Sequence, residues 1–305
     1  MLYHSYYCRK GKIELDWIAE YENTLKSAQK SPNTVSSFVS DVKEFLEWFS
    51  ITYGKEFDGI ILEQDVREYR GYLLNIIKRK PSTINRKMAA LKSFNLFLVE
   101  QGTSQEIPIK GLLMADPADR EIKTLERVEL NKLKRAIYAA GSKRDIAIFE
   151  LLYNCGLRVS ELVSLTVPDI ILTSRNGSHN FSYIIIRQGK GGKYRECPLN
   201  AQARSAIEAY LQIRSTTTDR VFVGQRGPLG REAVDKILKK YCIEAGIDSI
   251  SSHVIRHTFC TKLIQEGVPL PTVSRLAGHS SVETTTRFYV HTPRTDKIAA
   301  VEKLL

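Results

Sequence analysis

The last third of the sequence holds side chains whose types and spacing suit chemistry on a phosphate. His253 and Arg256 are three residues apart, which puts both on one face of a helix. A guanidinium offers a planar fork of donors to two phosphate oxygens, and an imidazole gives or takes a proton near neutral pH. Tyr289, ten positions after His279, supplies a nucleophilic hydroxyl that the neighbouring Phe288 lacks. If these segments converge, two imidazoles, a guanidinium and a phenol surround one anionic centre.

Four motifs occur in a fixed order around these residues. They are Gly156-Leu157-Arg158-Val159-Ser160-Glu161-Leu162, Gly189-Lys190-Gly191-Gly192-Lys193-Tyr194-Arg195, His253-x-x-Arg256, and Leu276-Ala277-Gly278-His279 followed by Tyr289. In type, order and spacing they resemble the tyrosine recombinase (phage integrase) family, and more narrowly its simple Xer-like or transposon-resolvase-like members. The resemblance covers roughly residues 116 to 291.

The resemblance implies a role for each matched residue. Arg158 and Arg256 would stabilise the extra negative charge on the non-bridging oxygens of the transition state without a metal. Tyr289 would attack phosphorus and form a 3′-phosphotyrosyl bond. Because that bond conserves the energy of the broken phosphodiester, a 5′ hydroxyl from a partner strand can reverse the attack without ATP.

Two histidines and a lysine complete the predicted catalytic set. His253 would act in general acid and base transfer, and His279 would hydrogen-bond the scissile phosphate or the phenol. Lys190, in a glycine-rich turn, would reach into a DNA minor groove and protonate the departing 5′ oxygen. Lys193 and Arg195 compete for that role, but the Gly-Lys-Gly match favours Lys190.

These assignments have simpler alternatives. Arg158 is three residues before Glu161, a spacing that permits an ordinary ion pair. Lys190 also suits an exposed hairpin tip with no chemical role. His257 and His291 adjoin motifs without occupying a matched position, so we interpret them as structural or DNA-surface residues.

The charge of the chain indicates an acidic partner. The formal net charge is +11, with 45 Lys and Arg residues against 34 Asp and Glu. Up to Met114 the counts are 16 against 14, and in the remainder they are 29 against 20. A solubilising surface charge is one interpretation of the excess, but its concentration around the motifs favours DNA.

Cysteine usage argues against a disulfide framework and a metal centre. Five cysteines are scattered without a C-x-x-C pair, so we expect buried or unreactive thiols. His253 and His257 have the i, i+4 spacing of a zinc hydrolase helix, but Val254 stands where that motif needs its glutamate. We therefore expect neither a metal nor another cofactor.

No run of 18 or more apolar residues exists, and the N-terminal residues lack an apolar signal region. With 43% apolar residues, the composition is that of a soluble globular protein. The sequence predicts a cytoplasmic location.

Hydrophobic periodicity predicts four helices and no strand before residue 114. They run from Ile13 to about Lys30, from Ser31-Pro32 through Phe49, from Glu63 to about Lys78, and from Pro81 to about Leu98. Lysines and arginines near the start of the fourth helix favour phosphate contact, although a solvated face is equally consistent. The resemblance implies that residues 1–114 form a helical DNA clamp.

Prolines and irregular spacing between Ile107 and Pro117 predict a linker, which places the catalytic domain at residues 115–305. In that domain a strand-like run from Phe181 to Arg187, a glycine turn and a run from Tyr194 to Leu199 predict a hairpin. Helices are predicted at about 125–140, 143–155, 201–213, 231–245 and 253–265, with short ones near Pro271 and Glu283. The predicted fold is mainly α with a small antiparallel sheet.

We predict a site-specific recombinase that works as a homotetramer on two paired DNA sites, in chromosome-dimer resolution, transposon cointegrate resolution or integration. The alternatives are a monomeric type IB topoisomerase and a DNA-binding protein without catalysis. Within Asp296–Leu305, apolar residues recur at three- and four-residue spacing, which favours a short helix that docks on a neighbouring subunit. Docking on its own catalytic domain is the alternative for this segment.

Overall fold

The computed structural model describes residues 17–106, 123–173, 181–187, 194–279 and 283–286. The chain divides into two compact units, Met1–Ala118 and Asp119–Leu305. The domain boundary predicted between residues 114 and 115 lies outside the described residues.

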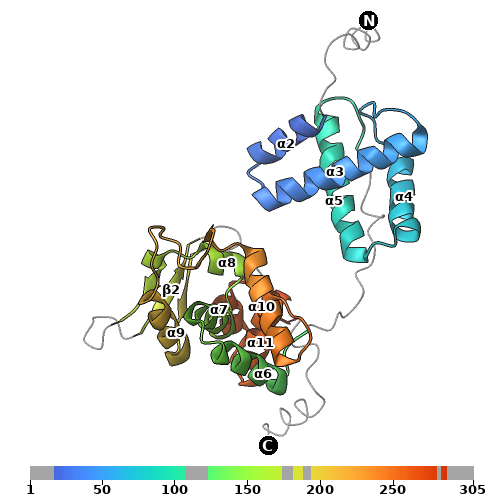
Figure 1. The fold of residues 1–305 in the computed structure, drawn as a ribbon. Coiled ribbons are helices and arrows are strands. Elements are labelled where there is room, and N and C mark those ends of the chain that lie inside the picture. The colour runs from blue at the N-terminus through green and yellow to red at the C-terminus, as the bar shows by residue number, and fades with distance from the viewer. Residues whose placement is uncertain (1–16, 107–122, 174–180, 188–193, 280–282, 287–305) are drawn as a thin grey trace, which may run out of the picture. The chain divides into compact units, whose positions relative to one another are not determined.

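The first unit is a bundle of helices, as the sequence predicts. Its elements are α2 (Trp17–Ser27), α3 (Pro32–Tyr53), α4 (Glu63–Gly71), the π-helical turn η1 (Tyr72–Ile76) and α5 (Pro81–Glu100). The predicted third helix therefore ends as α-helix at Gly71 and continues as one π-turn. Figure 1 shows the long α3 crossing α5, and α2 packs on both.

Local signals in the sequence set the ends of α3. Ser31 caps its start by accepting a hydrogen bond from the Thr34 N–H at 3.2 Å, and Pro32 occupies the first turn, where no N–H is needed. At the other end Gly54 adopts a left-handed conformation with φ of 63°, which a glycine does without steric cost.

The core of the first unit is aromatic, and a charged cluster lies beside it. Tyr21, Phe45, Tyr69 and Phe94 are fully buried and meet in edge-to-face pairs 5.1 to 5.2 Å apart. Polar contacts between α3 and α5 lie beside this core.

A buried lysine in α5 forms the centre of that charged cluster. Lys87, 2% exposed, donates to Asp41 at 2.9 Å and to Glu44 at 2.7 Å. Arg86 also pairs with Asp41. Because a buried charge without its partner is costly, these pairs hold α3 and α5 in one register.

The second unit is mainly helical with two small antiparallel sheets. Its helices are α6 (Arg127–Ala139), α7 (Lys143–Asn154), α8 (Val159–Ser164), η3 (Val167–Asp169), α9 (Ala201–Leu211), α10 (Arg231–Ala245), α11 (Ser252–Gln265), α12 (Leu270–Ala277) and α13 (Glu283–Thr286). The first sheet has the order β1 (Ile170–Ile171), β2 (Tyr183–Ile186), β3 (Arg195–Pro198), and β4 (Val223–Gly224) pairs with β5 (Gly227–Pro228). The predicted fold class is confirmed.

Sequence periodicity missed the shortest elements of this unit. α8 has six residues, and β1, β4 and β5 have two each. Such segments are too short to show a repeat, and their pairing partners fix them. In the main hairpin, Ile184 pairs with Cys197 and Ile186 with Arg195.

Helix α7 packs against α6, α8, α9 and α11 and so lies in the middle of the second unit (Figure 1).

Four cysteines among the described residues, Cys155, Cys197, Cys242 and Cys260, are free and buried, as expected. Among the described residues, no helix is long and apolar enough to cross a membrane.

The charged cluster between α3 and α5 makes a testable contribution to stability. Asp41→Ala removes a partner from buried Lys87, so we expect the free energy of unfolding of this unit to fall by about 3 kcal/mol. Both tryptophans, Trp17 and Trp48, lie in this unit, so fluorescence during denaturation in urea follows its unfolding.

The matched control is Glu63→Ala, which breaks an exposed Arg67–Glu63 pair within α4 and should change the free energy of unfolding by less than about 0.5 kcal/mol. Equal effects of the two substitutions would contradict a structural role for the buried cluster.

Candidate active site

The end of α7 places the first backbone group of the site. Gly156 follows the helix with φ of 58°, and a Cβ there would lie 2.3 Å from the Phe259 ring. Only glycine therefore fits between α7 and α11. Its carbonyl oxygen accepts a hydrogen bond from Arg256 Nη1.

Arg256 joins two helix ends. The residue is only 4% exposed, and its Nη2 donates to the Ala277 carbonyl at the end of α12. Because each Nη carries two N–H groups, the two backbone contacts use one on each nitrogen. The side chain is thereby fixed in place before any substrate arrives.

Helix α12 ends in a turn that leaves three carbonyls for arginines. Gly278 has φ of 65°, its N–H donates to Arg275 O at 3.0 Å, and the His279 N–H donates to Ser274 O at 2.9 Å. This is the pattern of a Schellman motif. The last carbonyls of a helix lack partners within the helix, and positive charge is favourable near them.

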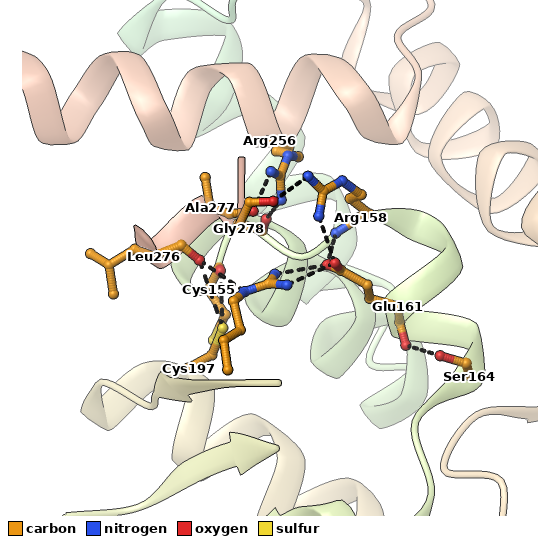
Figure 2. A network of polar contacts seen from close by, with 11 residues as sticks. Cys155, Arg158, Glu161, Ser164, Cys197, Arg256, Leu276, Ala277 and Gly278 are labelled. Carbon is orange, nitrogen blue, oxygen red and sulfur yellow. Dashed lines mark hydrogen bonds and ion pairs between the residues drawn. The ribbon is translucent and has the colours of Figure 1, made fainter. Parts of the chain in front are cut away.

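Three arginines bond to consecutive carbonyls of this turn, and Figure 2 labels two of them, Arg158 and Arg256. Arg195 Nε donates to Leu276 O at 3.2 Å, Arg256 donates to Ala277 O, and Arg158 Nη2 donates to Gly278 O at 2.5 Å. The three side chains come from β3, α11 and the residue before α8, which are far apart in the sequence. The turn that precedes His279 thus gathers them.

One buried carboxylate holds two of these arginines. Glu161, 3% exposed, accepts from Arg195 Nη1 and Nη2, both at 2.8 Å, and from Arg158 Nη1 at 2.7 Å. It also caps α8 by accepting from the Arg158 N–H at 2.8 Å. Burial alone raises the pKa of Glu161, but the Arg195 contacts, followed by those of Arg158, outweigh burial and lower it to about 2.

The cluster carries more positive than negative charge. It contains three guanidinium groups and one carboxylate, that of Glu161, which contacts Arg158 and Arg195. Burial, and then the neighbouring charge of Arg158, lower the pKa of Arg256 to about 10. Crowded like charges are stabilised when an anion binds between them, so this cluster suits an anionic ligand.

Two histidines next to the cluster are neutral near pH 7. His279 Nδ1 lies 2.8 Å from Thr285 Oγ1 of α13, and burial, followed by Arg256 and Arg158, lowers the pKa of His279 to about 4. Burial, followed by His253, lowers the pKa of His257 to about 4. A neutral imidazole can both donate and accept a hydrogen bond.

The structure brings together three of the six predicted site residues: Arg158, Arg256 and His279. His253 is exposed at the start of α11, with its ring 6.4 Å from that of His257. Lys190 and Tyr289 lie outside the described residues, as do His291 and the segment Asp296–Leu305. Within the described ranges no group of three or more His, Cys, Asp or Glu side chains could hold a metal ion.

The simple alternative for Arg158 is correct only in part. Its ion pair with Glu161 exists, but the same guanidinium also reaches Gly278. Sequence reasoning missed Arg195 as a member of this cluster and gave Glu161 only the role of an ion-pair partner. A signal was present for Arg195, because alternation along β3 puts it on the same face as buried Cys197.

Both units of the chain match models of known protein families. Residues 123–295 match the model of the phage integrase family, and residues 18–102 match that of the phage integrase N-terminal SAM-like domain. TnP I resolvase of Bacillus thuringiensis is 32% identical over 279 residues, covering 89% of this chain and 94% of its own. Tyrosine recombinase XerC of Roseiflexus castenholzii is 32% identical over 283 residues, covering 86% of this chain and 83% of its own.

A solved structure has the same fold. It is the Tn1549 transposon integrase (residues 82–397) in complex with circular intermediate DNA. The TM-score is 0.70 at 19% identity, over 93% of this chain and 98% of that one.

The lowered pKa values of His257 and His279 predict how the stability of the second unit depends on pH. Their folded pKa values lie below the ordinary value of 6.5, so the unfolded chain binds protons that the folded chain cannot. Stability is then complete above pH 6.5 and falls as the pH decreases toward 4. His257→Gln should reduce this slope between pH 7 and 5 by up to about 1.4 kcal/mol per pH unit.

Circular dichroism during denaturation at several pH values measures the slope. We expect the wild type to lose stability over this interval faster than His257→Gln. An identical slope in the two proteins would mean that the pKa of His257 is not lowered in the folded state.

Proposed function

The chain belongs to the phage integrase family of tyrosine recombinases, and from this premise we propose the role of each site residue in its reaction. The protein is a site-specific DNA recombinase, an enzyme that cleaves and rejoins DNA. The observation that carries the assignment of roles is the pair of arginines, Arg158 and Arg256, on adjacent carbonyls beside His279.

We assign to this pair the stabilisation of the scissile phosphate. In the transition state phosphorus bonds to both the entering and the leaving oxygen, so the non-bridging oxygens carry additional negative charge. Guanidinium groups fixed in advance stabilise that charge without having to reorganise. His279 donates or accepts the remaining hydrogen bond at the phosphate or at the nucleophile.

Tyr289 is the proposed nucleophile. Its phenolic oxygen attacks phosphorus, the bond between phosphorus and the 5′ oxygen breaks, and a 3′-phosphotyrosyl bond forms. His253 takes the phenolic proton, and Lys190 gives a proton to the departing 5′ oxygen. Attack by a 5′ hydroxyl from another strand reverses each of these transfers, so rejoining needs no cofactor.

The substrate we propose is double-stranded DNA at two paired recombination sites. A homotetramer would bring four Tyr289 hydroxyls to four strands, and a DNA substrate places the reaction in the cytoplasm. The excess of positive charge after residue 114 supports binding to the phosphate backbone. The relatives named as a resolvase and as a transposon integrase support a use in the resolution or integration of DNA.

Substitution of the nucleophile tests the chemistry. Tyr289→Phe should remove cleavage and leave site binding intact, because the hydroxyl attacks while the basic surface holds the DNA. With a nicked suicide substrate, denaturing gels should show a covalent protein–DNA adduct for the wild type alone. An adduct of normal yield from Tyr289→Phe would place the nucleophile elsewhere, and no adduct from the wild type would contradict the proposed function.

Truncation tests the proposed assembly. Removal of residues 296–305 should leave binding to a single site near normal but reduce synapsis and strand exchange, because the apolar segment docks on a neighbouring subunit. Gel shifts on one site and on paired sites separate these effects. Unfolding of the truncated protein would favour docking on its own domain, and normal synapsis would contradict docking on a neighbouring subunit.

A further inference from the structure

Arg195 is the one arginine of the cluster to which neither the motif match nor the chemistry above gives a role. As a competitor of Lys190 for proton donation it is a poor candidate, because its side chain is only 11% exposed and contacts a carboxylate and a carbonyl. A guanidinium so held has no route to a leaving oxygen. Its contacts point to a different task.

The first task that its contacts describe is the orientation of Glu161. Both terminal nitrogens of Arg195 bond to both oxygens of Glu161 at 2.8 Å, the bidentate geometry that fixes the plane of a carboxylate. That carboxylate in turn bonds to the side chain and the N–H of Arg158. Rotation of Glu161 would therefore move Arg158.

The second task of Arg195 is to hold the turn before His279 in position. Arg195 Nε donates to Leu276 O, and its guanidinium lies against Gly278, where a Cβ would be only 2.6 Å from Nη1 and 2.8 Å from Cζ. The absence of a side chain at Gly278 thus admits Arg195. The same turn offers its next two carbonyls to Arg256 and Arg158.

We propose that Arg195 is a positioning residue for DNA cleavage, which ties Glu161 to the Leu276–Gly278 turn and thereby holds Arg158 and Arg256 in the geometry that receives the scissile phosphate. This inference rests on the proposed function. Arg195 touches no substrate, and its effect passes entirely through the two other arginines and the backbone before His279.

The proposal predicts a specific kinetic defect. Displacement of a catalytic group by about 1 Å can cost about 100-fold in rate, so Arg195→Ala should slow formation of the covalent adduct by about 100-fold without weakening site binding. Arg195→Lys keeps the charge but cannot make the bidentate contact, and it should show a smaller loss of the same kind.

Three suicide substrates distinguish positioning from other roles. The first carries an ordinary phosphodiester, the second a methylphosphonate, whose neutral methyl group replaces one non-bridging oxygen, and the third a 5′-bridging phosphorothiolate, whose sulfur leaves without a proton. Because the arginines act on the negative charge, the rate ratio of wild type to Arg195→Ala should shrink by about tenfold or more on the methylphosphonate. It should persist on the phosphorothiolate, which should instead restore Lys190→Ala.

A matched control is available at the opposite end of α7. Arg144 also binds a buried carboxylate, Asp145, at 2.9 Å and a backbone carbonyl, that of Val223, at 3.2 Å. It lies 12 positions before Gly156, or about 18 Å along a helix. Arg144→Ala should leave the adduct rate of folded protein unchanged on all three substrates.

The outcomes separate the hypotheses. An equal rate loss for an Arg195 variant on the phosphodiester and the methylphosphonate would mean that Arg195 has only a structural role. If the phosphorothiolate restored the rate of the variant, Arg195 would be the general acid. If Arg195→Ala does not fold, Arg195→Lys undergoes the same comparison. Normal rates in both variants alongside a normal wild-type adduct would refute the positioning role alone, whereas failure of the wild type to form any adduct would refute the proposed function.

Discussion

Glu161 is the group on which the geometry of the site depends. It is buried, ionised and bonded to Arg195 and Arg158 at the same time, and it caps the helix that begins after Arg158. A buried carboxylate that lost one of these partners would be left with an uncompensated charge, at a cost of several kcal/mol. The folded state therefore allows few arrangements of the two guanidinium groups, and they are oriented in the free protein.

Helix ends supply the other half of this preorganisation. The C-terminal ends of α7 and α12 present carbonyls to Arg256, and the turn after α12 presents two more to Arg195 and Arg158. These carbonyls need donors, and the arginines need acceptors because they are largely enclosed. The arginine N–H groups satisfy the carbonyls, and the carbonyls satisfy the arginines, so the cluster is stable without a ligand. Because carbonyls carry no net charge, the cluster keeps its excess of positive charge.

The two units use the same physical principle for different purposes. In the first, buried Asp41 and Lys87, together with the more exposed Arg86, form a charged cluster that fixes the register of two helices. In the second, the cluster holds three guanidinium groups and one carboxylate, and burial together with Arg158 lowers the pKa of Arg256 to about 10. A network close to balance stabilises a fold, whereas one with surplus positive charge also prepares a place for an anion.

The sequence by itself determined the helical character of both units and the main hairpin, and its motifs predicted Arg158, Arg256 and His279 as candidate site residues, which the structure brings together. Helices such as α3 and α10 carry periodicity and glycine stops, and these are local properties that adjacent residues encode. The arginines were identifiable because motif spacing depends on residues close in the chain. Short elements such as β1 and α8 were missed because they contain too few residues to show a period.

Only the tertiary structure decided the role of Arg195 and the several bonds of Glu161. Arg195 is 34 positions from Glu161 and 81 from Leu276, and no spacing rule joins residues at such separations. Whether an arginine on a strand faces solvent, DNA or a buried carboxylate depends on what packs over that strand. Here α12 packs against β3, and Leu276 near the end of α12 accepts a hydrogen bond from Arg195. Arg195, which the sequence offered as a candidate proton donor, is therefore held against Glu161 instead.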